Sequence, residues 1–438
     1  MQLRRLSALA TALCASILAL ALALPVTGQD QSGGTGQPEE ALPDRVPVID
    51  VDSPERALYR IAVPNVLGDA TLGPQGAEVL RNDFRLVSLF EVLDARSFVA
   101  NLSEEGLNIS PQAWTAVGAQ GVIKGNVTVE GTQIVVEMRL YELARGGQAT
   151  LTRTYRGGRG EMRQFMHQFA NEVLNVLTGR AGAFGSRITF ARRRSTGRKD
   201  IMVATFDGDS VSRVSSGRGI AMLPSFGRGG VWYSILTEDG MYITRTGIQE
   251  RPIIQGGSLN MGVSVCGSRA YFSSTRDGNS EIYSTDLEGN DLRRLTNHPG
   301  IDVSPRCGGP GGQIAFVSTR HGSPQIFRMA ASGGTATRLT FRGDHNQTPA
   351  WCTGGPDGPL LAFTGRSGGF DVFTLNLQTQ RYTRLTQGQG TNKDPAFSPD
   401  CRMVAFYSSR GGIFLTSPEG LNQNLVIPGH AETLVWSR

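Results

Sequence analysis

A repeat of about 45 residues in the second half of the chain limits its fold more than any other feature. Each clear copy holds a short apolar run, a Gly-rich turn, an alternating run and a Leu-Thr ending, as in residues 270–296, 314–340 and 361–386. The anchoring aromatics lie 44, 47 and 43 residues apart, at Phe272, Phe316, Phe363 and Phe406. This spacing is typical of the four-stranded blade of a β-propeller.

Weaker copies surround Phe190 and Tyr233, and a further copy spans residues 403–426, so the pattern predicts six units. The chain then ends in a strand-like segment, 431–437, which is too short for another blade. The first unit begins at Arg187 without an opening strand, and the last segment can supply it. We therefore predict a six-bladed propeller over residues 181–438, closed by pairing the two ends of the domain.

The segment before the propeller follows a different pattern. Strands are predicted at 59–64, 91–93, 121–129, 133–143 and 149–155, and helices at 75–89, 110–117 and 161–177. Residues 55–180 form a segment long enough to bury a hydrophobic core of its own, and they are predicted to form an α/β sandwich domain. The whole chain is thus expected to be an α+β two-domain protein.

The first 28 residues have a basic start, an apolar run and small residues before a cut, which indicates an export signal peptide. Residues 29–44 are polar and rich in Gly and Pro, which predicts a flexible linker. The 56 Gly, the 21 Pro and the low charged fraction of 18% agree with a secreted, turn-rich protein. Elsewhere the sequence contains no run of about 20 apolar residues, so we expect no membrane span.

Four cysteines remain after the signal peptide, one in the opening segment of each of four successive blades. An exported protein meets an oxidising compartment, and adjacent blades bring these segments together. We predict disulfides between Cys266 and Cys307 and between Cys352 and Cys401. A zinc site lacks a close Cys pair or a His partner, and free buried thiols are the remaining alternative.

The net charge of +5 raises the question of nucleic acid or membrane binding. The positive charge is almost all Arg and is spread along the blades, apart from a cluster at 192–194 and 198–199. We interpret that cluster as a solvated hairpin tip and expect no nucleic-acid partner.

Residues 365–369 fit the Gly-x-Ser-x-Gly pattern of hydrolases, whose serine needs a strand, a sharp turn and a helix. Here the motif aligns with the turn 274–278 of another blade and leads into a strand, so a hairpin turn is expected. His298 and His345 have no third ligand at a suitable spacing, and Asp277-Gly278-Asn279 is ordinary turn chemistry. We expect no enzyme activity, no cofactor and no metal.

Three stretches of the N-terminal domain resemble the TolB family of the Tol-Pal envelope system: 61–69, 80–94 and 114–125. The blade repeats are similar to the Ser-Pro-Asp-Gly units of that family, and the resemblance covers about residues 45–438. It implies a monomeric, non-enzymatic adaptor in the periplasm that supports outer-membrane integrity and constriction during cell division. A generic periplasmic propeller that binds a glycan or a peptide is the alternative.

The resemblance also implies two partners. Residues 45–54 stand where the family's TolA-binding segment lies, and their alternation suits strand addition to a partner sheet. The residues in question are Val46, Val48, Ile49, Asp50, Val51 and Asp52. An edge strand of the chain's own domain is the competing interpretation.

The second partner is a Pal-like peptidoglycan-associated lipoprotein, which the family holds at the loops that enter the innermost strands. The matching positions are Leu259, Asn260, Asp302, Val303, Asn346, Gln347, Asn392 and Lys393. Short polar side chains around a channel mouth suit a hydrogen-bonded grip, whereas turn capping alone is the alternative role for each of them.

Overall fold

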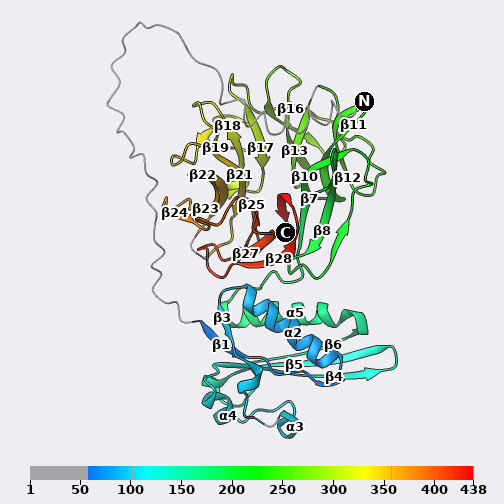
Figure 1. Cartoon of the computed structure of the whole chain (residues 1–438), viewed down its shortest axis with the longest axis vertical. Helices are drawn as coiled ribbons and strands as arrows, with labels where there is room; N and C mark the ends of the chain where they lie inside the picture. Colours follow the sequence, from blue (N-terminus) through cyan, green and yellow to red (C-terminus); the bar gives the residue numbers. More distant parts are fainter. Residues whose placement is uncertain (1–57, 101, 258, 357, 438) are drawn as a thin grey trace.

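The computed structural model of the protein describes residues 58–100, 102–257, 259–356 and 358–437 (Figure 1). The predicted signal peptide, the linker 29–44 and the expected TolA-binding residues Val46, Val48, Ile49, Asp50, Val51 and Asp52 lie outside these described residues. Within the described ranges, none of the helices is both long and apolar enough to span a membrane.

The N-terminal domain is built on a mixed sheet in which β1 runs parallel to both of its neighbours, β3 and β4. β4, β5 and β6 continue it as antiparallel hairpins, and β2 pairs with β4. The strands are β1 (Tyr59–Ala62), β2 (Leu67–Gly68), β3 (Phe90–Val92), β4 (Gly121–Glu130), β5 (Gln133–Glu142) and β6 (Leu151–Gly158).

Two long helices, α2 (Leu72–Leu86) and α5 (Met162–Thr178), lie between this sheet and the propeller, and the short α3 (Leu102–Glu105) and α4 (Pro111–Ala116) lie on the far side of the sheet (Figure 1). Helix α2 begins three residues earlier than predicted. The Asp69 carboxylate accepts the N–H groups of Thr71 and Leu72, which would otherwise lack partners at the helix start. Single 3₁₀ turns occur at Ala95–Ser97, Leu143–Arg145, Arg159–Glu161 and Pro310–Gly312.

The propeller begins just after Gly179, whose left-handed backbone ends α5. One seven-stranded sheet has the order β12-β11-β10-β8-β7-β29, with β9 on β8. Its strands are β7 (Arg187–Ser195), β8 (Arg198–Thr205), β9 (Val211–Arg213), β10 (Ile220–Gly227), β11 (Gly230–Thr237), β12 (Gly240–Arg245) and β29 (Glu432–Trp436).

Four four-stranded sheets follow in chain order, each a simple meander. The first two are β13 (Asn260–Cys266), β14 (Arg269–Ser274), β15 (Glu281–Asp286) and β16 (Arg293–Arg294), then β17 (Asp302–Arg306), β18 (Ile314–Ser318), β19 (Gln325–Met329) and β20 (Thr337–Arg338). The last two are β21 (Asn346–Cys352), β22 (Leu360–Arg366), β23 (Phe370–Asn376) and β24 (Tyr382–Arg384), then β25 (Asn392–Phe397), β26 (Val404–Ser408), β27 (Gly412–Thr416) and β28 (Asn424–Pro428).

The predicted closure of the ring is confirmed, because β29 at the chain end pairs with β7 at the start of the propeller. Trp436 lies opposite Ile188 in this antiparallel pair, and its indole N–H donates to the Ser186 hydroxyl at 2.7 Å. The predicted disulfides are also present, Cys266 with Cys307 and Cys352 with Cys401.

Each innermost strand of the ring carries a β-bulge at the same place. The residue in the bulge has a positive φ, between 51° and 69°, in all of them: Leu223, Gly262, Ser304, Thr348, Asp394 and Thr433. Five of these residues are not glycine, although residues with a side chain rarely adopt a positive φ. The bulge therefore imposes this backbone conformation in strand after strand.

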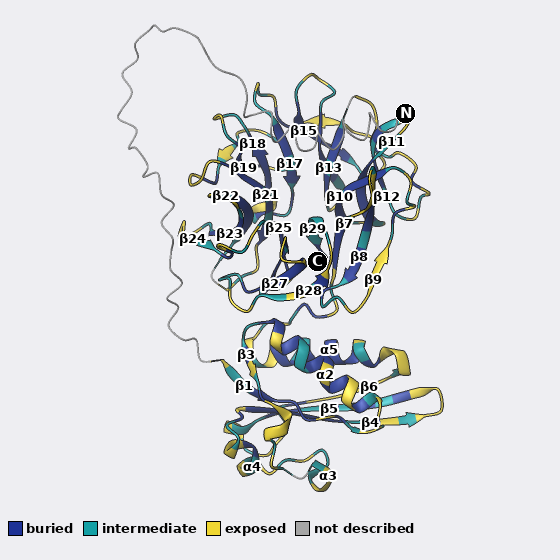
Figure 2. Cartoon of the chain, in the orientation of Figure 1, coloured by how far each residue is buried: buried dark blue, intermediate teal, exposed yellow. Residues whose placement is uncertain are grey.

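The two domains share one apolar core. Buried side chains of α2 and α5 continue without a break into buried residues of the propeller, as the dark blue faces in Figure 2 indicate. The contact runs through aromatic rings, with Phe84 6.4 Å from Phe184 and Phe184 5.6 Å from Phe206. The N-terminal domain is therefore packed against the propeller rather than joined only by the chain.

Candidate partner-binding face and domain interface

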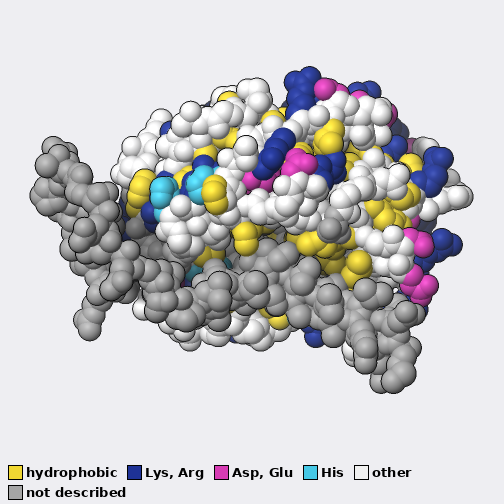
Figure 3. All heavy atoms as spheres, turned by 90° about the horizontal axis from the view of Figure 1, so that it is seen from above, with side chains coloured by type: hydrophobic (Ala, Val, Ile, Leu, Met, Phe, Trp, Pro, Cys, Tyr) yellow, Lys and Arg dark blue, Asp and Glu magenta, His cyan; other side chains and the backbone are white. Residues whose placement is uncertain are grey.

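The loop 398–403, which follows β25, faces the N-terminal domain. Arg402 donates to the carbonyl of Ala181 at 2.9 Å, and Arg180 donates to the carbonyl of Asp400 at 2.7 Å. The start of β25, and with it the starts of the other innermost strands, must therefore lie on the opposite face of the ring. Figure 3 shows the molecule from that end.

The structure places all the residues predicted to hold a lipoprotein on this opposite face, at or next to the strand starts. The first polar residue of each loop is nonetheless buried, with 0–2% of its surface exposed: Asn260, Asp302, Asn346 and Asn392. Asn346 donates to Gln325 of the preceding sheet at 2.7 Å, and Asn392 donates to Asp371 at 3.3 Å. Asn346 and Asn392 thus join neighbouring sheets, and the sequence pattern alone did not indicate this.

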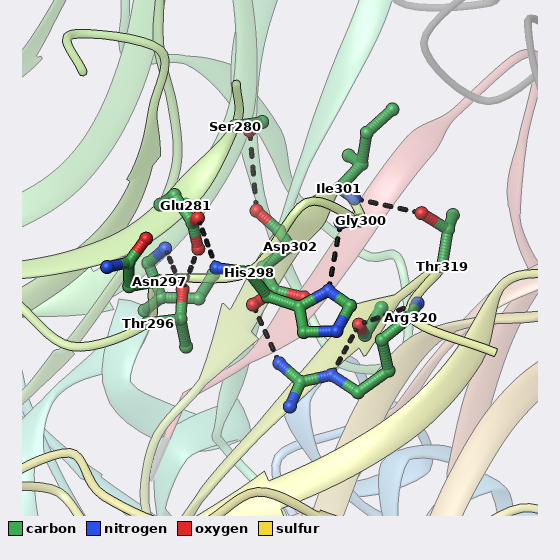
Figure 4. Close-up of polar contacts among 12 residues, drawn as sticks. Ser280, Glu281, Thr296, Asn297, His298, Gly300, Ile301, Asp302, Thr319 and Arg320 are labelled. Carbon is green, nitrogen blue, oxygen red and sulfur yellow. Dashed lines mark hydrogen bonds and ion pairs between the residues drawn. The ribbon is translucent and has the colours of Figure 1, made fainter. Parts of the chain in front are cut away.

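The junction before β17 contains charged side chains, and Ser280 donates there to the carbonyl of Asp302 in the next sheet at 3.3 Å (Figure 4). Arg320 donates to the Asp302 carboxylate at 2.8 Å, and the Glu281 carboxylate accepts from Thr296 at 2.5 Å and from the N–H of His298 at 2.8 Å. Burial raises the pKa of Asp302. These hydrogen bonds hold the loop that carries His298 in place.

The second residue of each loop immediately precedes the bulge residue of its strand. Val303 and Gln347 are each 8% exposed, and Lys393 is half-buried. Counting from the bulges, the equivalent residues of the other innermost strands are Met222, Met261 and Glu432. The mouth thus has an apolar arc and a polar arc.

Sequence reasoning missed Met222, Met261 and Glu432. A signal was available for Met222, because a proline follows the bulge at Pro224 as it does at Pro305, Pro349 and Pro395. Aligning the blades on that proline would have placed Met222 beside Gln347 and Lys393. Leu259, which was predicted, packs beside the apolar cluster of Met222 and Met261.

The channel itself is narrow, with a hollow of about 30 Å³ near the bulges. That is close to the volume of one water molecule, roughly 30 Å³ in the liquid. Arg306 and Asp394 line it. Burial raises the pKa of Asp394, and burial lowers the pKa of Arg306 to about 10. The interior of the channel therefore has no room for a side chain of another protein, and only its rim is open to contact.

The other sequence candidates have local roles. The motif 365–369 forms the turn between the antiparallel strands β22 and β23, as predicted, and contains no helix. His298 Nδ1 accepts the N–H of Gly300 at 2.9 Å, and His345 Nε2 lies 3.1 Å from Gln347. The two histidines were considered as metal ligands, and these ring-nitrogen contacts are each with a residue of the same loop.

A polar cluster lies where the N-terminal domain meets the propeller. His167 of α5 bonds through Nδ1 to Asp83 of α2 at 2.8 Å, and its Nε2 lies 3.7 Å from Asp207 of the propeller. Arg163 forms an ion pair with Asp207, whose side chain is fully buried. Asp83 and His167 interrupt the apolar faces of two predicted helices, and this interruption was the sequence signal that could have found them.

This Asp-His-Asp group is the one set of three or more metal-ligand side chains brought together within the described residues. Arg163 already places a positive charge beside Asp207, so the group is balanced as an ionic contact between the domains. Burial raises the pKa of Asp83 to about 6, with hydrogen bonding to His167 opposing the rise. One oxygen of Asp83 is buried without a hydrogen-bond partner.

This burial predicts a specific pH dependence. An Asp side chain in the unfolded chain has a pKa of ~3.9. In the folded protein the Asp83 carboxyl keeps its proton up to about pH 6. The contribution of this group to stability is therefore greatest below the unfolded pKa and is lost as the pH rises through 6. Asp83→Asn removes this titration. We expect the stability of the wild type relative to the variant to fall by on the order of 2 kcal/mol between about pH 4 and pH 7.

Thermal unfolding at a series of pH values measures this difference. Asp209→Asn is the matched control, because Asp209 also faces Arg163, at 3.3 Å, but has half of its side chain exposed. The control should keep the wild-type pH profile. An unchanged profile in Asp83→Asn would show that Asp83 does not titrate in this range.

Two family models match the chain. The model of the TolB amino-terminal domain matches residues 47–149, and the model of the TolB β-propeller domain matches residues 174–356. The two regions correspond to the sheet-and-helix domain and to the larger part of the ring.

Curated relatives agree with the models. The chain is 34% identical over 288 residues to the Tol-Pal system protein TolB of Anaeromyxobacter dehalogenans, a match that covers 61% of this chain and 64% of the relative. It is 31% identical over 221 residues to the protein TolB homolog of Chlorobium luteolum, which covers 49% of this chain and 50% of the relative. These matches span one half to just under two thirds of the relatives' length.

A solved structure extends the comparison over both domains. The crystal structure of TolB from Acinetobacter baumannii superposes with a TM-score of 0.74 at 25% identity, covering 86% of this chain and 96% of that one. Its similarity spans the N-terminal domain as well as the propeller. With models for both domains, curated relatives and a solved structure in agreement, the chain belongs to the TolB family.

Proposed function

We propose that the protein is a non-enzymatic periplasmic adaptor of the Tol-Pal system, which links a Pal-like outer-membrane lipoprotein to TolA. In this role it supports outer-membrane integrity and envelope constriction during cell division. The observation that carries the proposal is that both family domains occur together, with one propeller face turned away from the N-terminal domain. Ser367 of the hydrolase-like motif lies in a hairpin turn and not between a strand and a helix, so the motif gives no support for a hydrolase.

We also propose to count the ring as six blades, in front of an α/β sandwich. The seven-stranded sheet divides at the contact between β10 and β8, where a single register pair, Ile220 with Lys199, joins them. The bulge that recurs once in each innermost strand supports this count. The strand β29 is then the innermost strand of the first blade.

For the lipoprotein contact, we propose a division of labour on the opposite face. The buried Asn260, Asp302, Asn346 and Asn392 would hold the loops in place, because their side chains already bond within the ring. Leu259, Val303, Gln347 and Lys393 would meet the partner. An apolar arc beside a polar arc matches the mixed character of protein interfaces.

For TolA, we propose that residues 45–54 add a strand to a sheet of the partner. The support is the alternation of Val46, Val48, Ile49 and Val51 and the position of the segment just before β1. Deleting residues 45–54 is expected to abolish TolA binding and to leave lipoprotein binding unchanged. Pull-down with each partner measures both results.

Lys393→Glu tests the lipoprotein face. Reversing a charge at the mouth should weaken binding by at least about tenfold, or ~1.4 kcal/mol. Calorimetric titration with the Pal-like lipoprotein of the same bacterium measures the change. Arg381→Glu is the control, because Arg381 is exposed in the turn between β23 and β24, on the face toward the N-terminal domain.

Equal losses in both variants would contradict the assigned face. If the wild-type protein fails to bind the lipoprotein at all, the adaptor role is wrong, and a propeller for a glycan or peptide ligand becomes the better explanation.

A further inference from the structure

A hollow at the tip of the hairpin between β7 and β8 carries a concentration of positive charge that the adaptor role does not use. Its volume is about 130 Å³. It is lined by Arg193, Ser195, Thr196, Gly197, Arg198, Lys199 and Ile220.

The backbone register brings like charges together in the hollow. Arg193 and Lys199 are directly opposite each other in the antiparallel pair, and Ser195 is opposite Arg198. Residues in such positions project to the same side of a sheet, and like charges there destabilise it. A bulge between Arg193 and Ser195 inserts one further arginine, Arg194.

A neighbouring loop adds more cations. A Cβ at Gly217, whose φ is 85°, would lie 3.0 Å from a terminal nitrogen of Arg213 and 3.4 Å from one of Arg194. Two guanidinium groups from different strands therefore lie beside the same glycine. Arg218 follows in the same loop and is exposed.

The acidic groups nearby neutralise only part of this charge. Lys199 pairs with Glu432 at 2.5 Å, and Arg213 lies 3.9 Å from the buried Asp200. In the described ranges, no carboxylate lies within 4 Å of a side-chain nitrogen of Arg193, Arg194, Arg198 or Arg218. Arg193, Arg194 and Arg198 are exposed at the tip of the β7–β8 hairpin, as the sequence predicted, and two of them also line the hollow.

We propose that this hollow binds a phosphate group. Guanidinium groups offer paired N–H donors that match phosphate oxygens, and several of them favour an anion with more than one negative charge. The hydroxyl groups of Ser195 and Thr196 supply further donors. The volume corresponds to roughly four water molecules, which is room enough for a phosphate group. The phosphate can belong to a lipid headgroup or to a soluble molecule.

The experiment uses the full chain, pyrophosphate as the soluble probe, and vesicles of zwitterionic phospholipid with and without added anionic phospholipid. Calorimetry follows pyrophosphate, and co-sedimentation follows the vesicles. Arg193→Gln combined with Arg198→Gln should weaken pyrophosphate binding by at least about tenfold, because two charge-assisted contacts are lost. Both residues are exposed, so folding should be preserved, and circular dichroism checks this.

Arg228→Gln combined with Arg381→Gln is the control, since it removes the same charge from exposed positions elsewhere on the ring. We expect its affinity to stay within about twofold of the wild type. Loss of both pyrophosphate and anionic-vesicle binding in the first variant assigns the site to a headgroup phosphate, and loss of pyrophosphate binding alone assigns it to a soluble phosphate.

Equal binding by the two double variants, or no saturable pyrophosphate binding by the wild type, overturns the proposal. None of these measurements involves the lipoprotein, so their failure is separate from a failure of the adaptor role.

Discussion

Trp436→Ala is expected to lower the free energy of unfolding by about 3–5 kcal/mol. Trp436 is 5% exposed, and it belongs to the apolar core shared by both domains. The change removes its packing, leaves a cavity and takes away the N–H that donates to the Ser186 hydroxyl, which keeps its own bond to the Ala183 carbonyl. It acts on β29, the strand that pairs the two ends of the ring, so the loss should spread to the whole propeller.

Urea unfolding measures the loss. It is followed by far-ultraviolet circular dichroism, which reports the backbone and not tryptophan fluorescence. Leu421→Ala is the matched control, because Leu421 is 46% exposed in the turn after β27, and its loss should stay below about 0.5 kcal/mol. A cost for Trp436→Ala as small as that of the control would mean that β29 does not hold the ring closed.

Removing the disulfides is expected to have an effect of similar size. The bridges close loops with sequence separations of 41 and 49 residues. For loops of this length, constraint of the unfolded chain stabilises the folded protein by about 4 kcal/mol per bridge. The double variants Cys266→Ala with Cys307→Ala and Cys352→Ala with Cys401→Ala should each lose about 2–5 kcal/mol.

Denaturant unfolding with and without a reducing agent measures these losses. Reduction of the wild-type protein should reproduce the summed effect, and a variant without all four of these cysteines should not respond to the reducing agent. If the wild-type stability is the same before and after complete reduction, the bridges contribute nothing to it.

Much of the fold was predictable because the local pattern and the tertiary structure agree. The repeat around Phe272, Phe316 and Phe363 predicted strands that the structure places in successive sheets, and the missing first strand before Arg187 predicted the role of β29. The cysteine pairs were predictable because one cysteine recurs in the opening segment of each of four neighbouring blades.

The candidate site was less predictable, because burial between blades is not visible in a repeat. Asn346 and Asn392 had the composition of surface loops, yet their partners Gln325 and Asp371 lie about 21 residues earlier, in the preceding sheet. Asp83 and His167 are 84 residues apart, and only the packing of α2 on α5 brings them together. The phosphate-binding hollow likewise depends on register and a bulge, which composition does not give.

The position of β1 has a mechanical consequence. This strand is the first described element, and it lies inside its sheet with β3 on one side and β4 on the other. A pull on the chain before residue 58 would act along β1 and load the hydrogen bonds on both sides in shear, so that they must break together. Forced unfolding is governed by the unfolding rate. Because β1 is a central strand, it would let the chain transmit tension from its N-terminal segment into the apolar core that both domains share.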